Sequence, residues 1–200
     1  MAYGTYKTIE EVGKKFDIES EFVEFLKEEK VQIEVLFFQF FLKNLKTPRN
    51  YISENSICET IISPILNIIT EKHLLPVWSH VHFDVSEEEG LTGIPDFLIA
   101  PTSKTGFTYT NPIVCIAEVK KENFEEGWTQ VLCEMIAAQR FNNKPNETIY
   151  GIATSGSMWQ FGKLIGKKFI MDPRIYSATV DLQRLLDALN WFICEAKKEL

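Results

Sequence analysis

The sequence predicts an α/β fold in which a mixed central sheet is flanked by helices. Apolar residues recur at helical spacing near both ends of the chain, whereas the middle alternates or runs apolar over strand lengths. The run Ile-Val-Cys-Ile-Ala at 113–117 is too apolar for a sheet with one face in water, which indicates helices on both faces. The expected order is helix, three strands, helix and strand, with helical additions at both ends.

Two helical patterns precede the first expected strand. Residues 19–46 carry apolar side chains at helical spacing and are rich in phenylalanine. We expect most of this surface to pack in the chain's own core, and contact with a second copy or another protein is the alternative. The run Thr47-Pro48-Arg49-Asn50 breaks the pattern. A second helix is expected at 53–72, where several isoleucines share one face.

The later elements follow from changes in the hydrophobic period. Alternation predicts a strand at 77–83, and an acidic turn at 86–93 follows it. A loop rich in Thr and Ser, at 101–112, separates the next two strands. The further strands are expected at 96–100, 113–120, 148–153, 158–164 and 169–171, and the further helices at 124–141 and 180–197.

The length of 200 residues suits a single domain. We expect an N-terminal helical extension at 1–50, a core at 53–164, and a C-terminal strand and helix at 165–200. A content of 45% hydrophobic and 24% charged residues excludes a disordered or fibrous chain. The net charge of −7 gives no overall attraction to nucleic acid, so such a partner must meet a local basic patch.

The chain has the features of a cytoplasmic protein. No apolar run approaches the roughly 20 residues that span a bilayer, and the N-terminus lacks the basic and apolar regions of a signal peptide. The cysteines are far apart and form no CxxC pair, so we interpret them as buried reduced thiols. They are Cys58, Cys115, Cys133 and Cys194.

Two carboxylates and a lysine lie at the ends of two expected strands. Side chains alternate along a strand, so Glu118 and Lys120 project from the same face. If the strands pair as a hairpin, Asp96 comes beside Glu118, and the two carboxylates repel unless a cation lies between them. Mg²⁺ and Mn²⁺ prefer such oxygen ligands, and a lysine ammonium there would position the attacking water and offset charge on a phosphate. This set suits metal-assisted hydrolysis of a phosphodiester.

Solvated charges at strand ends are the alternative interpretation of these residues. Glu118 favours a site, because its strand is otherwise apolar and a carboxylate there needs a reason.

The runs Pro95-Asp96 and Glu118-Val119-Lys120 resemble the motif of the PD-(D/E)XK nuclease superfamily, whose fold is restriction-endonuclease-like. With Ser53-Glu54 before them and Gln130 after them, the layout looks most like the nuclease domain of type I restriction enzyme subunits. The resemblance implies that Asp96 and Glu118 bind Mg²⁺ or Mn²⁺, that Lys120 is the catalytic lysine, and that the substrate is DNA.

In this superfamily the first helix often supplies another acid, and two residues compete for the role. At about 100° per residue, Glu54 lies within the apolar stripe of its helix, whereas Glu59 falls towards the polar side. We prefer Glu54 as the ligand or orienting group. Glu59 has a second explanation, because Ser56 to Glu59 fits a capping box. A helix that begins at Ser56 would leave Glu54 outside it.

Related nucleases that process DNA ends often place a glutamine on the helix after the lysine strand, with a tyrosine four residues later. Gln130 matches the glutamine, and Glu134 stands in the tyrosine's place. These two share a helix face and would approach the metal or the phosphate, while a polar face in solvent is the alternative. His80 and His82 would share one face of a strand, but Asp84 is the sole candidate for a third zinc ligand.

Basic residues near the expected site would form a strip for backbone phosphates. The 101–112 loop would touch the substrate or would be a plain surface hairpin. The residues of the strip are Lys120, Lys121, Arg140, Lys144, Lys163, Lys167, Lys168 and Arg174.

The sequence therefore predicts a nuclease that hydrolyses DNA phosphodiesters with Mg²⁺ or Mn²⁺. Asp96, Glu118 and Glu54 are its expected metal ligands, and Lys120 and Gln130 its further catalytic residues. The alternative is a catalytically inactive relative that binds nucleic acid or a protein partner.

Overall fold

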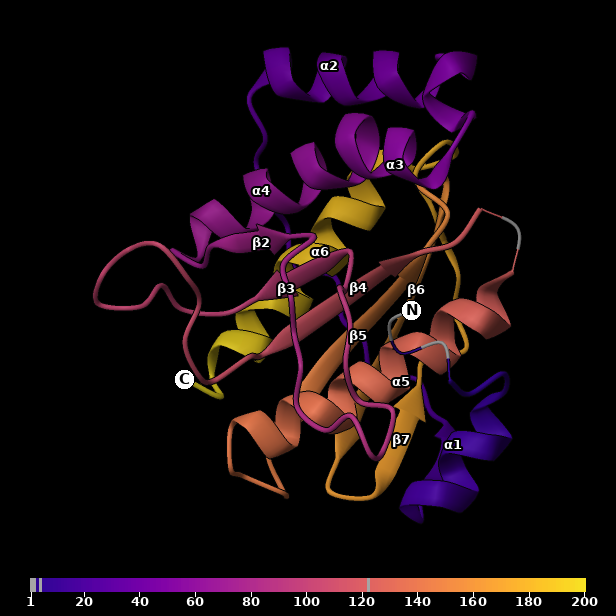
Figure 1. The fold of residues 1–200 in the computed structure, drawn as a ribbon. Coiled ribbons are helices and arrows are strands. Elements are labelled where there is room, and N and C mark those ends of the chain that lie inside the picture. Colours follow the sequence, from indigo (N-terminus) through magenta and orange to yellow (C-terminus); the bar gives the residue numbers. More distant parts are fainter. Residues whose placement is uncertain (1–2, 4, 122) are drawn as a thin grey trace.

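The computed structural model describes Tyr3, residues 5–121 and residues 123–200. A sheet of eight strands runs through the molecule in the order β1-β7-β6-β5-β4-β3-β2, and β8 pairs with β6 (Figure 1). The strands are β1 (Glu19–Phe22), β2 (Val77–Ser79), β3 (Phe97–Ile99), β4 (Cys115–Val119), β5 (Thr148–Thr154), β6 (Met158–Ile165), β7 (Lys168–Met171) and β8 (Tyr176–Ser177).

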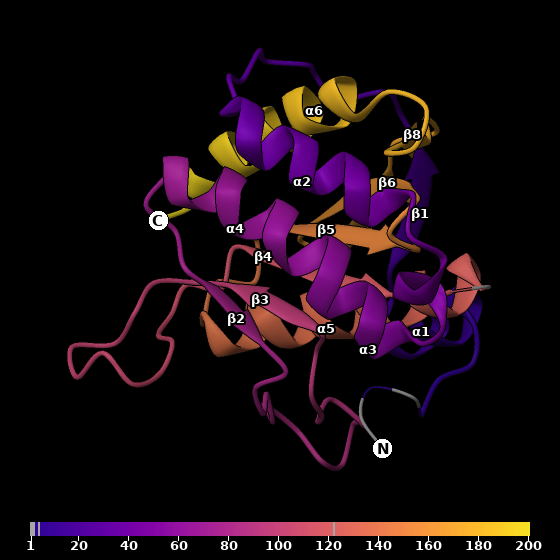
Figure 2. The same ribbon diagram turned by 90° about the horizontal axis from the view of Figure 1, so that it is seen from above.

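Helices lie on both sides of this sheet. Figure 2 shows α2, α3, α4 and α6 on one face and α1 and α5 on the other. The α-helices are α1 (Ile9–Phe16), α2 (Val35–Leu45), α3 (Glu54–Ile57), α4 (Ser63–Lys72), α5 (Phe124–Phe141) and α6 (Leu182–Lys197). A 3₁₀ turn, η1 (Pro48–Tyr51), precedes α3, and a π-helical segment, η2 (Cys58–Ile62), joins α3 to α4.

The predicted α/β fold with a mixed sheet and flanking helices is confirmed. The pairs β1–β7 and β4–β5 are parallel, and the other pairs are antiparallel. Each face of the sheet buries its own apolar cluster, one under α3, α4 and α6 and the other under α5. The expected core order of helix, three strands, helix and strand is also present, as α3–α4, β2, β3, β4, α5 and β5.

The prediction of one helix over residues 19–46 is wrong in its first half. Glu19–Phe22 pairs in parallel with β7 and forms an edge of the sheet, and the helix begins only at Val35. The predicted N-terminal extension is therefore not wholly helical, because it supplies this edge strand.

Distant side chains fix the extended segment between β1 and α2. One carboxylate oxygen of Asp172 accepts hydrogen bonds from the backbone N–H groups of Phe25 (3.0 Å) and Leu26 (2.9 Å). Asp187 on α6 accepts another from the N–H of Val31. These long-range bonds satisfy backbone groups that a helix would otherwise have paired, so tertiary contacts override the local spacing.

Two smaller predictions also need correction. The strand expected at 77–83 ends at Ser79, because His80 has a left-handed backbone with φ of 50°. His80 and His82 therefore do not share a face of one strand. Cys194 is half-buried rather than buried, although all four cysteines, which lie in the described part of the chain, are free thiols as expected.

The described residues include no helix that combines the length and apolar character needed to cross a bilayer. The expected lack of a signal peptide concerns residues that include Met1, Ala2 and Gly4, which lie outside the described part of the chain.

Candidate active site

The register of β3 and β4 brings Asp96 beside Glu118. These strands are antiparallel, with Phe97 opposite Ala117, so the residues that come next on each strand face each other. The backbone N–H of Asp96 donates to Oε1 of Glu118 at 3.0 Å, and the N–H of Val119 donates to Oδ2 of Asp96 at 2.8 Å. Both carboxylates are thereby oriented by the backbone of the neighbouring strand.

Glu54 reaches the same place from the first turn of α3. Ser53 caps this helix by accepting from the N–H of Ser56, so the helix starts before Ser56 and a capping box from Ser56 to Glu59 is not formed. Oε2 of Glu54 lies 3.6 Å from Nζ of Lys120, and Oε1 accepts from the backbone N–H of Lys121 at 3.2 Å. Glu59 is exposed to solvent.

Lys120 extends the pairing of β4 and lies among acids. Its backbone N–H donates to the carbonyl of Thr154, and its side chain is 18% exposed. The side chain passes α5 at a glycine: a Cβ on Gly127 would lie 3.2 Å from Cγ of Lys120. Burial disfavours the charged ammonium, but the carboxylates of Glu118, Glu54 and Asp96 outweigh it and raise the pKa of Lys120. The side chain is therefore a cation at neutral pH.

Glu118 and Glu134 form a buried pair of carboxyl groups. Glu118 is 3% exposed and Glu134, on α5, is 1% exposed. Burial, followed by the Asp96 carboxylate, raises the pKa of Glu118. Burial, followed by Glu118, also raises the pKa of Glu134. Both carboxyl oxygens of Glu134 are buried without a hydrogen-bond partner among the described residues, which favours the neutral acid over the carboxylate.

The surroundings of Asp96 act on its pKa in opposite directions. Burial raises the pKa of Asp96, while the hydrogen bond from Val119 and the nearby His80 and Lys120 side chains act in the opposite direction. Nε2 of His80 lies 3.3 Å from Oδ1 of Asp96. His82 is instead 3.7 Å from Asp84, at the surface. The structure therefore does not place His80 and His82 together on one strand face. It places His80 alone beside Asp96.

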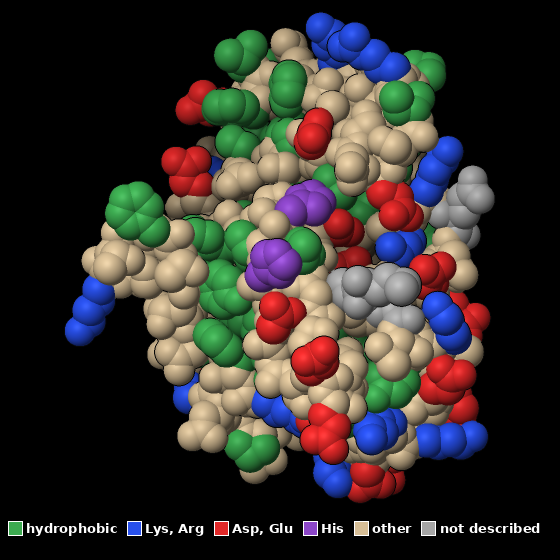
Figure 3. All heavy atoms as spheres, in the orientation of Figure 1, with side chains coloured by type: hydrophobic (Ala, Val, Ile, Leu, Met, Phe, Trp, Pro, Cys, Tyr) green, Lys and Arg blue, Asp and Glu red, His purple; other side chains and the backbone are tan. Residues whose placement is uncertain are grey.

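A hollow of about 280 Å³ opens next to Lys120. Gln130 contributes to its wall, and the Oε1 of Gln130 is buried without a hydrogen-bond partner among the described residues. The other lining residues are Tyr6, Lys7, Asn123 and Glu126. The hollow therefore offers space for a polar group beside Lys120 and Gln130. Figure 3 shows His side chains next to Asp and Glu side chains on the face of the molecule that it displays.

The donors near Lys120 match a hard divalent cation in ligand type. Asp96 and Glu118 meet across the ends of β3 and β4, and Glu54 reaches Lys120, but the described residues do not bring the oxygen atoms of all three carboxylates within 4.8 Å of one another. Burial is the first cause of the raised pKa values of Asp96 and Glu118, so it disfavours their charged forms. A bound cation of the Mg²⁺ or Mn²⁺ type would offset these charges with the ligand type that it prefers.

Ion pairs and local contacts engage most residues of the expected basic strip, and its contact with phosphates stays a prediction. Most members of the set face nearby acids, and Arg174 is structural, since it donates to Asp172 and to the carbonyl of Leu26. Lys163 lies over the ring of Phe25. The ion pairs of the set are Lys120–Glu54, Arg140–Glu89, Lys144–Glu147, Lys167–Asp17, Lys168–Glu21, Arg174–Asp172 and Arg174–Glu24.

Comparison with known proteins gives a distant structural likeness. No family model and no curated protein matches the chain. Among solved structures, the chain is similar to the type IIG restriction endonuclease BpuSI, with 20% sequence identity and a TM-score of 0.41. The match covers 72% of this chain and 16% of that one. The match therefore spans less than a fifth of that protein's length, and the likeness assigns no activity or site residue to this chain.

Two neighbours of the predicted site were not selected from the sequence as site residues. From the sequence, Cys58 is interpreted as a buried thiol, and His80 is grouped with His82. Cys58 lies four residues after Glu54, which is the spacing of one helix face, so its position near Glu54 could be predicted from the sequence. The position of His80 could not, because it depends on the left-handed backbone that ends β2.

Proposed function

We propose that the chain is a nuclease that hydrolyses phosphodiester bonds of DNA with Mg²⁺ or Mn²⁺. The observation that carries this proposal is the meeting of Asp96, Glu118 and Lys120 at the adjoining ends of β3 and β4. Buried carboxylates without compensation are costly, and perturbed acids of this kind cluster at functional sites.

Asp96 and Glu118 would hold the cation, and Glu54 would act as a third ligand or would orient Lys120. A bound divalent cation supplies charge stabilisation at the phosphate and a lowered pKa for a coordinated water. Asp96 and Glu118 contribute by being oriented in advance, because their hydrogen bonds with the strand backbone already fix both carboxylates.

Lys120 would act as a cation rather than as a base. The raised pKa of Lys120, due to the nearby carboxylates that outweigh its burial, keeps the ammonium protonated. A protonated lysine donates hydrogen bonds to a phosphate oxygen or to the attacking water and stabilises the negative charge that grows on the phosphate. Gln130, on the wall of the neighbouring hollow, would hold the water or a phosphate oxygen through its amide.

Titration with Mn²⁺ tests the metal-binding part of this proposal. We expect calorimetry to detect Mn²⁺ binding to the wild type and not to Asp96→Ala. Asp84→Ala is the matched control, because Asp84 is an exposed acid that faces His82 on the same side of the molecule. Unchanged binding by Asp96→Ala, or its loss in Asp84→Ala, would contradict the assigned ligands.

The second candidate function is a noncatalytic module that binds another molecule. The outer face of α2 favours it, because apolar side chains there are exposed over the top of the molecule (Figure 3). They are Val35 (72%), Leu36 (73%), Phe37 (40%) and Phe40 (46%). The predicted core burial of the phenylalanine-rich segment thus holds for Phe41, and in part for Phe25 and Phe38, which pack against the core, but not for this face.

A second copy of the chain is the partner we propose to test first for this face, because a shared apolar face is self-complementary across a twofold axis. Sedimentation velocity should show a dimer for the wild type and a monomer for Leu36→Glu. A wild type that stays monomeric at high concentration would contradict the proposal that α2 forms a dimer interface.

A further inference from the structure

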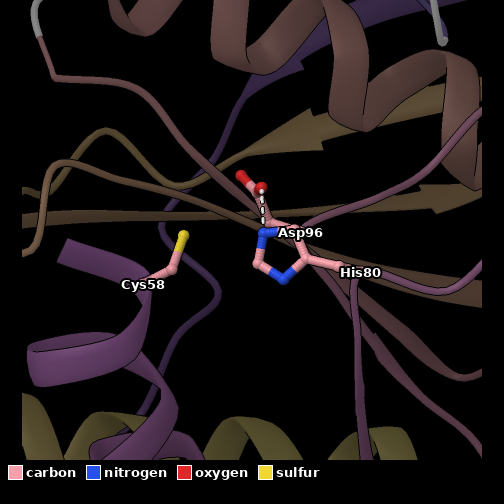
Figure 4. Close-up of side chains that lie close together, drawn as sticks. All are labelled: Cys58, His80 and Asp96. Atoms are coloured by element: carbon pink, nitrogen blue, oxygen red, sulfur yellow. Dashed lines mark ion pairs between the residues drawn. The ribbon is translucent and has the colours of Figure 1, made fainter. Parts of the chain in front are cut away.

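Three donor side chains of different chemistry converge at one edge of the site. Cys58 opens the π-helical segment η2, His80 follows β2, and Asp96 precedes β3. The thiol sulfur, one imidazole nitrogen and one carboxylate oxygen all lie within 4.8 Å of one another. Figure 4 shows the three side chains pointing toward a common space, with His80 and Asp96 joined by the 3.3 Å contact.

We propose that Cys58, His80 and Asp96 form a binding site for a thiophilic divalent cation of the zinc class. Typical bond lengths of about 2.3 Å to sulfur and about 2.0–2.1 Å to nitrogen and oxygen place tetrahedral ligands roughly 3.3–3.6 Å apart. The separation of 3.3 Å between His80 and Asp96 already has this value. The thiol, within 4.8 Å of both, needs only a short movement.

The donor set favours zinc over the magnesium class. Thiolate and imidazole are soft or borderline ligands, whereas Mg²⁺ takes oxygen ligands and retains water. A set of three protein ligands leaves a fourth tetrahedral position, and the His80 side chain, 42% exposed, provides access to it from solvent. This site therefore differs in chemistry from the all-oxygen set of Glu54, Asp96 and Glu118.

The surroundings of the three residues support a cation. Ser79 lies with its hydroxyl 2.7 Å from Nδ1 of His80, so a hydrogen bond at Nδ1 leaves Nε2 free to face the metal. The carboxylates of Asp96, Glu118 and Glu54 lie close enough to Cys58 to act on it, and they would offset the charge of a bound cation. On binding, the S–H bond would break, its proton would pass to solvent and the metal–sulfur bond would form.

Sharing Asp96 has a further consequence, which rests on the proposed nuclease function. A zinc-class ion on Asp96 would compete with the magnesium-class ion that the same carboxylate is proposed to hold. Binding at Cys58 and His80 itself does not depend on catalysis.

Cobalt(II) is the probe for this site, because a bond to thiolate gives an intense charge-transfer absorption. Titration of the full chain with Co²⁺ should produce this band at one equivalent. We expect the band to be absent in Cys58→Ser and the affinity to fall at least tenfold in His80→Ala, as expected for a lost ligand. Cys194→Ser and His82→Ala are the matched controls, and both should retain the band.

The results separate this site from the nuclease proposal. A wild type without the band, a band that persists in Cys58→Ser, or unchanged affinity in His80→Ala would overturn the zinc-class site. If Cys58→Ser does not fold, as judged by circular dichroism, the partly exposed His80 variant decides the question. Failure of the nuclease proposal would show as absent cleavage and would leave the cobalt band unaltered.

Discussion

Asp96 and Glu118 orient each other across the adjoining ends of β3 and β4. The N–H of Asp96 donates to the Glu118 carboxylate, and the peptide that follows Glu118 donates back to the Asp96 carboxylate. Asp96 and Glu118 continue the antiparallel register of β3 and β4 by one residue, so the pairing of the strands fixes the relative position of the two side chains. Both side chains are consequently fixed without help from a flexible loop, which is the support that a precise metal site requires.

Exchange of Glu54 distinguishes the two candidate helix acids. Glu54→Gln removes the charge that lies 3.6 Å from the Lys120 ammonium, so we expect a loss of metal affinity or cleavage of roughly 10–100-fold. Glu59→Gln, an exposed position on the next turn, should leave both unchanged. Cleavage assays and Mn²⁺ titration on the two variants measure this directly. Equal losses in both variants would contradict the choice of Glu54.

Gln130 should affect the reaction more than the fold. Its Oε1 has no partner among the described residues, so Gln130→Ala removes no hydrogen bond made by this atom in the metal-free protein. We expect cleavage to fall about 10-fold or more and the melting temperature to change little. Gln39→Ala, at an exposed position on α2, is the control. A large drop in melting temperature with normal cleavage would make Gln130 a structural residue.

The metal-free protein should lose stability as the pH rises. Burial, with Asp96, raises the pKa of Glu118, and burial, with Glu118, raises the pKa of Glu134. Between the ordinary glutamate pKa and these raised values, the folded state binds more protons than the unfolded state. For each extra proton that the folded state binds, a rise of one pH unit lowers the free energy of unfolding by about 1.4 kcal/mol.

Thermal unfolding in the presence of a chelator measures this dependence. The melting temperature should fall as the pH rises from the ordinary glutamate pKa of 4.5 towards about 8. Glu134→Gln should flatten the curve, because its amide keeps the shape of the acid without a charge. A melting temperature that rises over this range, or a Glu134→Gln curve as steep as the wild type, would show that the pair is not protonated in the folded state.

Asp172 should be a main support of the segment between β1 and α2. Its carboxylate accepts from the N–H groups of Phe25 and Leu26 and pairs with Arg174. Asp172→Ala should lower the free energy of unfolding by about 2–4 kcal/mol, because buried donors and a partly buried cation lose their partner. Glu24→Ala is the control, since Glu24 is 69% exposed at 4.0 Å from Arg174. Urea denaturation with equal losses in both variants would contradict this role.

The sequence predicts elements well where the local pattern and the tertiary contacts agree. Helix α5 has the expected bounds, 124–141, because a long apolar face coincides with an Asn123 cap and an acidic first turn. The 19–34 segment has helical spacing as well, but its backbone partners, such as Asp172, lie some 147 positions away along the chain. Local periodicity contains no information about such partners.

The same distinction applies to the site. The approach of Asp96 to Glu118 follows from strand alternation and hairpin pairing, which are local rules. The position of Cys58, four residues after Glu54, follows from the spacing of one helix face. The approach of His80 to Asp96 depends instead on the left-handed backbone of His80, for which periodicity gives no signal, so this contact became visible only in three dimensions.

Cleavage of supercoiled plasmid and of single-stranded DNA with Mg²⁺ or Mn²⁺ tests the central claim most directly. The wild type should cut in the presence of the metal. Lys120→Ala should cut more slowly by roughly 10²–10³-fold, because the phosphate loses its stabilising cation. Lys72→Ala, at an exposed position on α4, is the control and should cut as fast as the wild type. Metal-dependent cutting that survives in Lys120→Ala, or a folded wild type that neither cuts nor binds Mn²⁺, would contradict the nuclease assignment.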